Sequence, residues 1–151
     1  MSVRFAAGSA LRVPIPGGRV AFGVMLATRP YMAFFDDRQV DAKKLTGFEG
    51  SPLFIVAVHN SSYSTGRWGA SLVHLPKESL PPIPYFFRQN VLRPSDCVIV
   101  DSDGNTRTAA PEDCLKLERS AVWSAEHIER RIEDHYAGRP NAFLESMKVK
   151  L

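Results

Sequence analysis

The stretch ALRVPIPGGRVAFGVMLAT, residues 10–28, carries the pattern of two strands joined by a turn. In its first half Leu11, Val13 and Ile15 alternate with an arginine and a proline, a pattern typical of a half-buried strand. Gly17-Gly18 readily adopts the positive φ of a tight turn, and apolar residues alternate again after it. We therefore expect an antiparallel hairpin whose first strand is short or lies at a sheet edge, because its prolines lack amide donors.

Short apolar runs separated by turn residues continue along the chain. YMAFF at residues 31–35 predicts a third strand, and PLFIVAVH at residues 52–59 predicts a central strand buried on both faces. RWGASLVHL at residues 67–75 predicts the next strand. CVIVDSDGNTRTA at residues 97–109 predicts a second hairpin around a two-residue Asp-Gly turn. The polar residues 38–51 are expected to form a long loop or an insertion with a helical turn.

Helical periodicity appears only near the end of the chain. Ser124 is a favoured N-cap, and Ile128 and Ile132 share one face of the helix that follows. Gly138 fits the position just after the helix, with a proline beyond it. The opposite face is expected to be polar and to carry Glu126, Arg130 and Asp134. We expect one amphipathic helix docked on the sheet.

Strands first and a helix last indicate an α+β fold. We expect a twisted antiparallel sheet of five to seven strands, with barrel-like curvature, and a C-terminal amphipathic helix. A chain of 151 residues has the common size of one domain, so residues 1–151 are expected to form a single domain. With 44% hydrophobic and 23% charged residues, the chain is neither disordered, collagen-like nor a disulfide-rich miniprotein.

The net charge of +3 is mildly basic, and the arginines are too evenly spread to form a nucleic-acid-binding run. Cys97 and Cys114 form no C-x-x-C motif, and we expect two reduced thiols in the core. No signal peptide and no apolar run long enough to cross a bilayer is recognised. A cytoplasmic protein without membrane contact is the resulting expectation.

No familiar catalytic or metal-binding motif occurs. The sequence has no H-E-x-x-H zinc motif, no phosphate-binding loop and no G-x-S-x-G around the serines that follow His59. Asp101-x-Asp103 lacks the further ligands of a calcium loop. We therefore expect no cofactor, no metal and no catalytic residue.

Several residue groups share their order with one known family. A strand ends in Ile-Pro, a glycine turn follows, and a strand of aromatic and small residues leads to Phe-Phe-Asp, at Ile15, Pro16, Gly18, Phe22, Gly23, Phe34, Phe35 and Asp36. A mid-chain Gly-x-Trp and the terminal helix add Gly66, Trp68, Trp123, His127, Arg131 and Asp134. From about Leu11 to Asn141 the chain resembles the immunity protein 26 family of bacterial polymorphic toxin systems.

The resemblance implies binding rather than catalysis. An immunity protein is made beside a toxin and neutralises it in the producing cell, commonly by covering the active site or a neighbouring surface. The expected partner is therefore a cognate toxin domain. Immunity proteins against nucleases tend to be acidic, whereas this chain is basic. Either its binding face is a local acidic patch or its toxin is not a basic nuclease.

Acidic residues in loops on the sheet are the candidate contacts with a toxin. They are Asp36, Asp37 and Asp41 in one loop and Asp101 and Asp103 in the second hairpin. The polar face of the C-terminal helix is a third option. Trp68 is expected to lie in the core rather than at a binding surface.

Two other functions stay open. The first is a small SH3-like β-module that binds nucleic acid, with bases stacked on Tyr31, Phe34, Phe35, Tyr85, Phe86 and Phe87. The second is a hydrolase that uses Asp36 or His59, which requires a deep pocket uniting those side chains.

Overall fold

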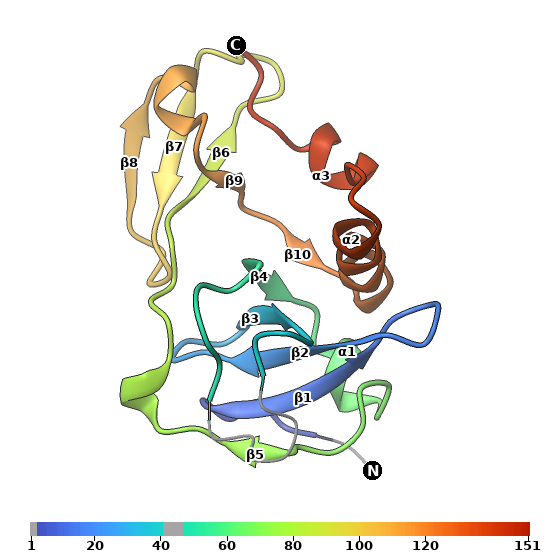
Figure 1. Cartoon of the computed structure of the whole chain (residues 1–151). Coiled ribbons are helices and arrows are strands. Elements are labelled where there is room, and N and C mark those ends of the chain that lie inside the picture. The colour runs from blue at the N-terminus through green and yellow to red at the C-terminus, as the bar shows by residue number, and fades with distance from the viewer. Residues whose placement is uncertain (1–2, 41–46) are drawn as a thin grey trace.

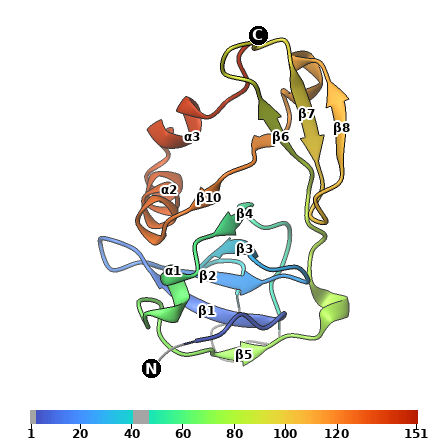
Figure 2. The ribbon, with the colours of Figure 1, turned by 180° about the vertical axis from the view of Figure 1, so that it is seen from behind.

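The computed structural model describes residues 3–40 and 47–151. In this part of the chain ten strands form two sheets, so the α+β expectation is confirmed. The first sheet has the order β10-β4-β3-β2-β1-β5 and the second the order β8-β7-β6-β9. Figures 1 and 2 show them at opposite ends of the molecule, with α2 and α3 beside them on one side. Neither sheet closes into a barrel.

The strands of the first sheet are β1 (Ser9–Pro14), β2 (Val20–Met25), β3 (Tyr31–Asp36), β4 (Phe54–Val58), β5 (Val73–His74) and β10 (Val122–Trp123). Those of the second are β6 (Phe86–Gln89), β7 (Cys97–Val100), β8 (Thr106–Ala109) and β9 (Glu118–Arg119). The helices are α1 (Ser61–Ser64), α2 (Ala125–Ala137) and α3 (Ala142–Ser146), with 3₁₀ turns η1 (Lys77–Ser79) and η2 (Pro111–Cys114). Pairing is antiparallel except for β10 with β4 and β9 with β6.

The first predicted hairpin is confirmed. Leu11 pairs with Gly23 and Val13 with Ala21, and Gly17 and Gly18 in the turn have φ of 91° and 86°. The leucine and valine are fully buried because their side chains point to the same face of the sheet. β1 is not wholly an edge strand, since the two-residue β5 pairs with its N-terminal half.

Two strand predictions need correction. β4 is largely buried, but it lies next to the edge of the sheet rather than at its centre. The segment at residues 67–75 contributes only the two-residue β5, because much of the segment before it runs as turns. Trp68 lies in the core, as predicted, with its ring edge-on to Phe34 at 5.8 Å between centroids.

Helix α2 begins and ends where the sequence predicts. The Ser124 hydroxyl accepts from the His127 amide (3.3 Å), and Gly138 caps the other end in the left-handed conformation. Ile128 and Ile132 are fully buried against the first sheet. The predicted polar face is wrong at Asp134, which is buried.

Contacts between side chains join the two sheets. Arg131 of α2 makes two hydrogen bonds to the carboxylate of Glu118 on β9 (2.9 and 2.8 Å), and Tyr31 of β3 stacks on Phe86 of β6 at 5.6 Å. Cys97 and Cys114 are free and buried in the small core of the second sheet, as predicted. No helix of the described residues is long and apolar enough to cross a membrane.

Candidate functional site

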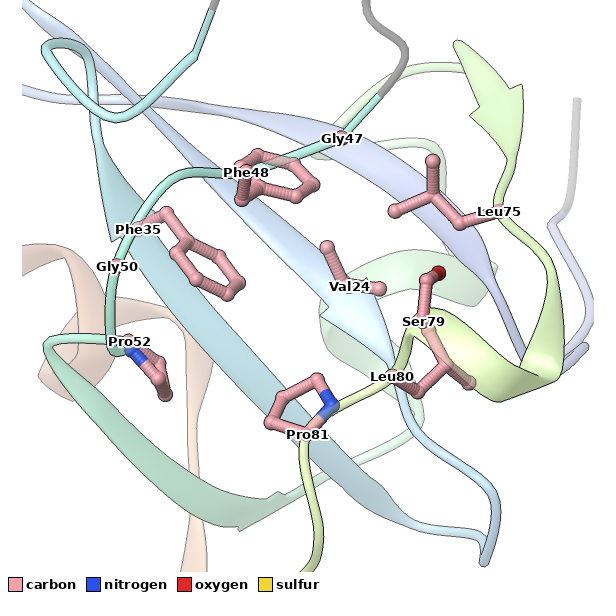
Figure 3. A pocket seen from close by; sticks show the side chains of 10 residues that line it. All are labelled: Val24, Phe35, Gly47, Phe48, Gly50, Pro52, Leu75, Ser79, Leu80 and Pro81. Carbon is pink, nitrogen blue, oxygen red and sulfur yellow. The ribbon is translucent and has the colours of Figure 1, made fainter.

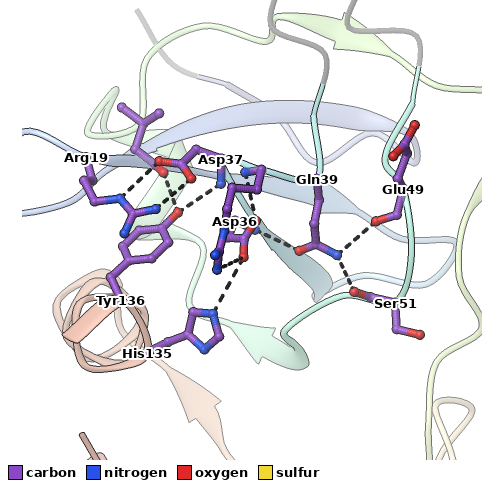
Figure 4. A network of polar contacts seen from close by, with 10 residues as sticks. Arg19, Asp36, Asp37, Gln39, Glu49, Ser51, His135 and Tyr136 are labelled. Atoms are coloured by element: carbon purple, nitrogen blue, oxygen red, sulfur yellow. Dashed lines mark hydrogen bonds and ion pairs between the residues drawn. The ribbon is translucent and has the colours of Figure 1, made fainter. Parts of the chain in front are cut away.

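Asp36, the first acidic candidate, is only 5% exposed at the end of β3. Its carboxylate accepts from the amide (2.9 Å) and the guanidinium (3.2 Å) of Arg38, and His135 of α2 lies 3.7 Å away (Figure 4). Burial by itself would raise the pKa of Asp36, but the hydrogen bonds from Arg38 outweigh it and the pKa is lowered. This carboxylate therefore shapes the turn after β3 and is not open to a partner.

Asp37 connects three parts of the fold. Arg19, beyond the first turn, donates two hydrogen bonds to its carboxylate (3.2 and 2.8 Å). The amide of Asp37 donates to the Tyr136 hydroxyl of α2 (3.0 Å), which itself donates to the Val20 carbonyl (2.7 Å). The Arg19 guanidinium also lies 3.5 Å from the centre of the Tyr136 ring. The charge of Asp37 is thus already paired, although 29% of the side chain is exposed.

After β3 the chain turns at Asp37 and Arg38, and its described residues further on are held by hydrogen bonds and a β-bridge. Gln39 accepts from the Asp36 amide and donates to the carbonyls of Glu49 and Ser51 (Figure 4). Val40 forms a β-bridge with Phe48. Neither part forms the helical turn considered from the sequence. Asp41 lies outside the described residues.

The acids of the second hairpin have different roles. The Asp101 carboxylate accepts from the amides of Asp103 and Asn105 (both 2.9 Å) and from the Asn105 side chain (3.0 Å). The side-chain bond from Asn105, followed by its backbone bond, holds the pKa of Asp101 below its ordinary value. The predicted two-residue turn is wrong, because the Asp101 amide bonds the Asn105 carbonyl and the turn contains three residues. Asp103 alone among the described acidic candidates is well exposed.

These acids do not form one patch. Tyr31, the first residue of β3, stacks on Phe86, and Phe86 pairs with Val100, so Asp101 follows directly after a residue near this end of β3. Asp36 is the last residue of the same six-residue strand. At ~3.3 Å per residue the two ends lie roughly 17 Å apart. The described candidates therefore do not form a local acidic binding face.

The alternative sites are not assembled either. Tyr31, the first residue of β3, pairs with Ala57, so His59 lies beyond that end of the strand. Asp36 is the last residue of β3, which puts it roughly 20 Å from His59. The His59 imidazole instead bonds the Ser61 hydroxyl locally, with 2.8 Å between Nδ1 and Oγ. Among residues 3–40 and 47–151 no cluster of His, Cys, Asp or Glu is placed to hold a metal ion.

The aromatic residues considered for base stacking serve mainly as core. Four are buried in the two sheets: Phe34, Phe35, Phe86 and Phe87. Tyr31 is half-buried on Phe86, which leaves Tyr85 as the exposed ring of this set. A single exposed ring offers no series of stacking platforms.

One cavity lies against the outer face of the first sheet. It has a volume of about 180 Å³, and its walls include Val24, Phe35, Phe48 and Leu80 (Figure 3). Phe35 and Phe48 stack across one side at 4.3 Å between ring centroids. The part of its lining that the structure describes is mainly apolar and contains no charged side chain.

Sequence reasoning missed the most exposed apolar residues of the described chain, which lie between β6 and β7. Residues 90–96, here called the tip loop, expose 90% of Val91 and 91% of Leu92. The Asn90 side chain accepts from the amides of Leu92 (2.9 Å) and Arg93 (3.0 Å), which fixes the loop. An aliphatic pair between an asparagine and a Pro-Ser-Asp run was the available signal, because such turn sequences are normally polar throughout.

A groove lies beside the tip loop, with a volume of about 190 Å³. Gln89 in its wall donates to the carbonyls of Pro94 (2.8 Å) and Lys150 (2.6 Å), so the last residues of the described chain are fixed against the loop. Arg119 and Lys150 give the groove a basic lining. The tip loop and this groove together form the best-defined candidate surface.

Comparisons of the chain with protein-family models, with curated proteins and with solved structures found no match.

Proposed function

We propose that this chain is an immunity protein that binds a cognate bacterial toxin domain and neutralises it in a stoichiometric complex, with the tip loop as an anchor. The observation that carries the proposal is the exposure of Val91 and Leu92 on a loop held by hydrogen bonds. Apolar side chains on a rigid loop favour association, because the loop loses little conformational freedom on binding. The sequence resemblance supplies the class of partner.

The charge around the tip loop indicates the kind of surface it would cover. Basic side chains lie close to the aliphatic pair: Arg93 follows it in the tip loop, and Arg119 and Lys150 line the groove that Val91 borders. Basic groups beside an apolar centre are complementary to an acidic surface with an apolar pocket. The net charge of +3 is then no obstacle, provided that the toxin presents an acidic face.

The test is neutralisation by co-expression. The reading frame beside this gene is expected to encode a toxin domain that kills bacterial cells and is silenced when this chain is present. Purification of the two proteins is expected to give an equimolar complex. A toxin that still kills while both proteins are present in solution would refute the proposal.

The V91D/L92D double variant tests the surface. Burying two such side chains contributes about 3 kcal/mol or more, so the variant should bind the toxin at least ~100-fold more weakly. Unfolding free energy should change by less than about 0.5 kcal/mol, since both residues face solvent in the free protein. Leu72→Asp, an exposed leucine beside β5, is the matched control and should retain full binding. Unchanged affinity in the double variant would remove the tip loop from the interface.

A further inference from the structure

Strand β8 forms an open edge of the second sheet. β7 is its sole partner among the described residues, and the two views in Figures 1 and 2 place β8 at the outside of the molecule. The other terminal strands, β5, β9 and β10, are two residues long, whereas β8 has four. A two-residue edge strand offers too few backbone groups to pair with another chain. β8 is therefore the terminal strand on which a further strand can add.

The hydrogen-bond pattern shows which backbone groups of β8 face outward. The Asp101 amide bonds the Asn105 carbonyl (3.0 Å), which makes these two residues a hydrogen-bonded pair. Pairs of this kind alternate along an antiparallel ladder, so Arg107 with Ile99 and Ala109 with Cys97 are also bonded. Thr106 and Thr108 therefore direct their N–H and C=O groups away from β7. Neither residue has another backbone bond in the described chain.

Arg107 gives this edge one charge, but β8 lacks the proline and the very short length that protect other edges of the two sheets. The unpaired half of β1 ends in Pro14, which has no amide to offer. β8 contains no proline, and Thr106, Arg107 and Thr108 are all exposed. No ion pair in the described chain uses Arg107. The strand thus offers free backbone groups around one unpaired cation.

A second copy of this chain fits the edge poorly. Two copies related by a two-fold axis would use the outward groups of both threonines by pairing Thr106 with Thr108. That register sets Arg107 directly opposite its own copy in a non-hydrogen-bonded pair, with Cα atoms ~4.5 Å apart. Like charges in this position oppose pairing, whereas an opposite charge favours it.

We propose that β8 accepts an extended strand of a partner protein that places an Asp or Glu opposite Arg107. The added strand would bond the outward groups of Thr106 and Thr108 and extend the second sheet by one strand. This inference rests on the proposed function in naming a toxin domain as the natural source of the strand. The recognition chemistry itself depends only on the backbone and charge of β8.

The test uses a short synthetic peptide of alternating threonine and valine with one central glutamate, titrated into the full chain and followed by amide NMR. Shifts are expected at Thr106 to Thr108, with slower hydrogen exchange at the two threonine amides. Arg107→Glu should weaken binding of this peptide roughly tenfold and favour a peptide with lysine at the centre. Thr108→Pro removes one outward amide and should abolish binding, while Thr108→Val keeps that amide and should not.

The outcomes separate the two proposals. Shifts elsewhere in the chain, or no shifts at millimolar peptide, would overturn the β8 inference whatever the toxin experiment gives. If the Arg107→Glu variant still prefers the peptide with glutamate over the peptide with lysine, the proposed contact between Arg107 and an acidic residue is overturned. Failure of neutralisation with intact peptide binding would refute the immunity function alone.

Discussion

The two sheets differ in how much of their surface the fold uses for itself. The first sheet has apolar clusters on both faces, and α2 inserts Ile128 and Ile132 into one of them. The second has one small cluster around Phe87, yet it carries the exposed tip loop and the open edge of β8. The first sheet therefore supplies most of the buried apolar surface, and the second presents exposed apolar side chains and unpaired backbone groups to solvent.

The largest expected effect concerns the core of the first sheet. Ile132→Asp puts an unpaired charge at a fully buried position and should cost at least ~3 kcal/mol of unfolding free energy. Arg130→Ala, on the exposed side of the same helix, should cost less than about 0.5 kcal/mol. Urea unfolding of both variants measures the contrast, and equal losses would show that the helix docks through another face.

The second effect concerns the connection between the sheets. Glu118→Ala leaves the buried Arg131 guanidinium without its carboxylate and should cost about 2 kcal/mol, less than a fully buried pair because Glu118 is 30% exposed. Amide exchange should accelerate more in β6 to β9 than in β1 to β4. Lys148→Ala breaks an exposed ion pair and should cost less than about 0.5 kcal/mol. Equal acceleration in both sheets would mean that they unfold as one unit.

A pH dependence is expected from Asp134. Burial alone would raise its pKa, but bonds from Arg139 and Asn141 outweigh burial and the pKa is lowered. A lowered folded-state pKa contributes stability above the unfolded value of about 3.9, and this contribution disappears as the pH falls through the folded value. Asp134→Asn should therefore be less stable than the wild type at neutral pH, with a gap that narrows below about pH 4. A gap independent of pH in urea titrations would contradict this.

The smallest effect separates two acids of one hairpin. Asp101→Ala removes the acceptor of three hydrogen bonds and should speed amide exchange at Asp103 and Asn105. Asp103→Ala removes an exposed carboxylate and should leave the hairpin unchanged. Exchange rates that rise equally in both variants would show that the Asp101 carboxylate does not hold the turn.

Features governed by neighbouring residues could be predicted from the sequence. The Gly17-Gly18 hairpin and the Ser124 cap depend on turn and capping preferences within a few positions. The burial of Asp36 and Asp134 was not predicted, although their partners Arg38, Arg139 and Asn141 lie within seven residues along the chain. Charge patterning shows which residues can pair but does not report that the turns close over the two carboxylates and bury them. The parallel strands β9 and β10 have two residues each, too few to show the alternation of apolar and polar residues that predicts a strand. The division into two sheets was therefore not predicted.

The candidate site shows the same limit. Charge predicted aspartates as the contacts with a partner. Of the four that are described, Asp36, Asp37 and Asp101 instead form hydrogen bonds or ion pairs within the chain. Val91 and Leu92 are exposed because the paired part of β6 and β7 ends at Gln89 and Cys97, before the loop begins. The composition of the sequence does not show where these strands end.

Both tryptophans of the chain, Trp68 and Trp123, lie in the apolar cluster between the first sheet and α2. Intrinsic indole fluorescence therefore follows melting of that cluster and is nearly blind to the rest of the molecule. Circular dichroism, by contrast, samples backbone from both sheets. If the β6–β9 sheet opens first, the two spectroscopic curves will not superimpose, so an emission-only assay would overstate how intact a damaged variant is.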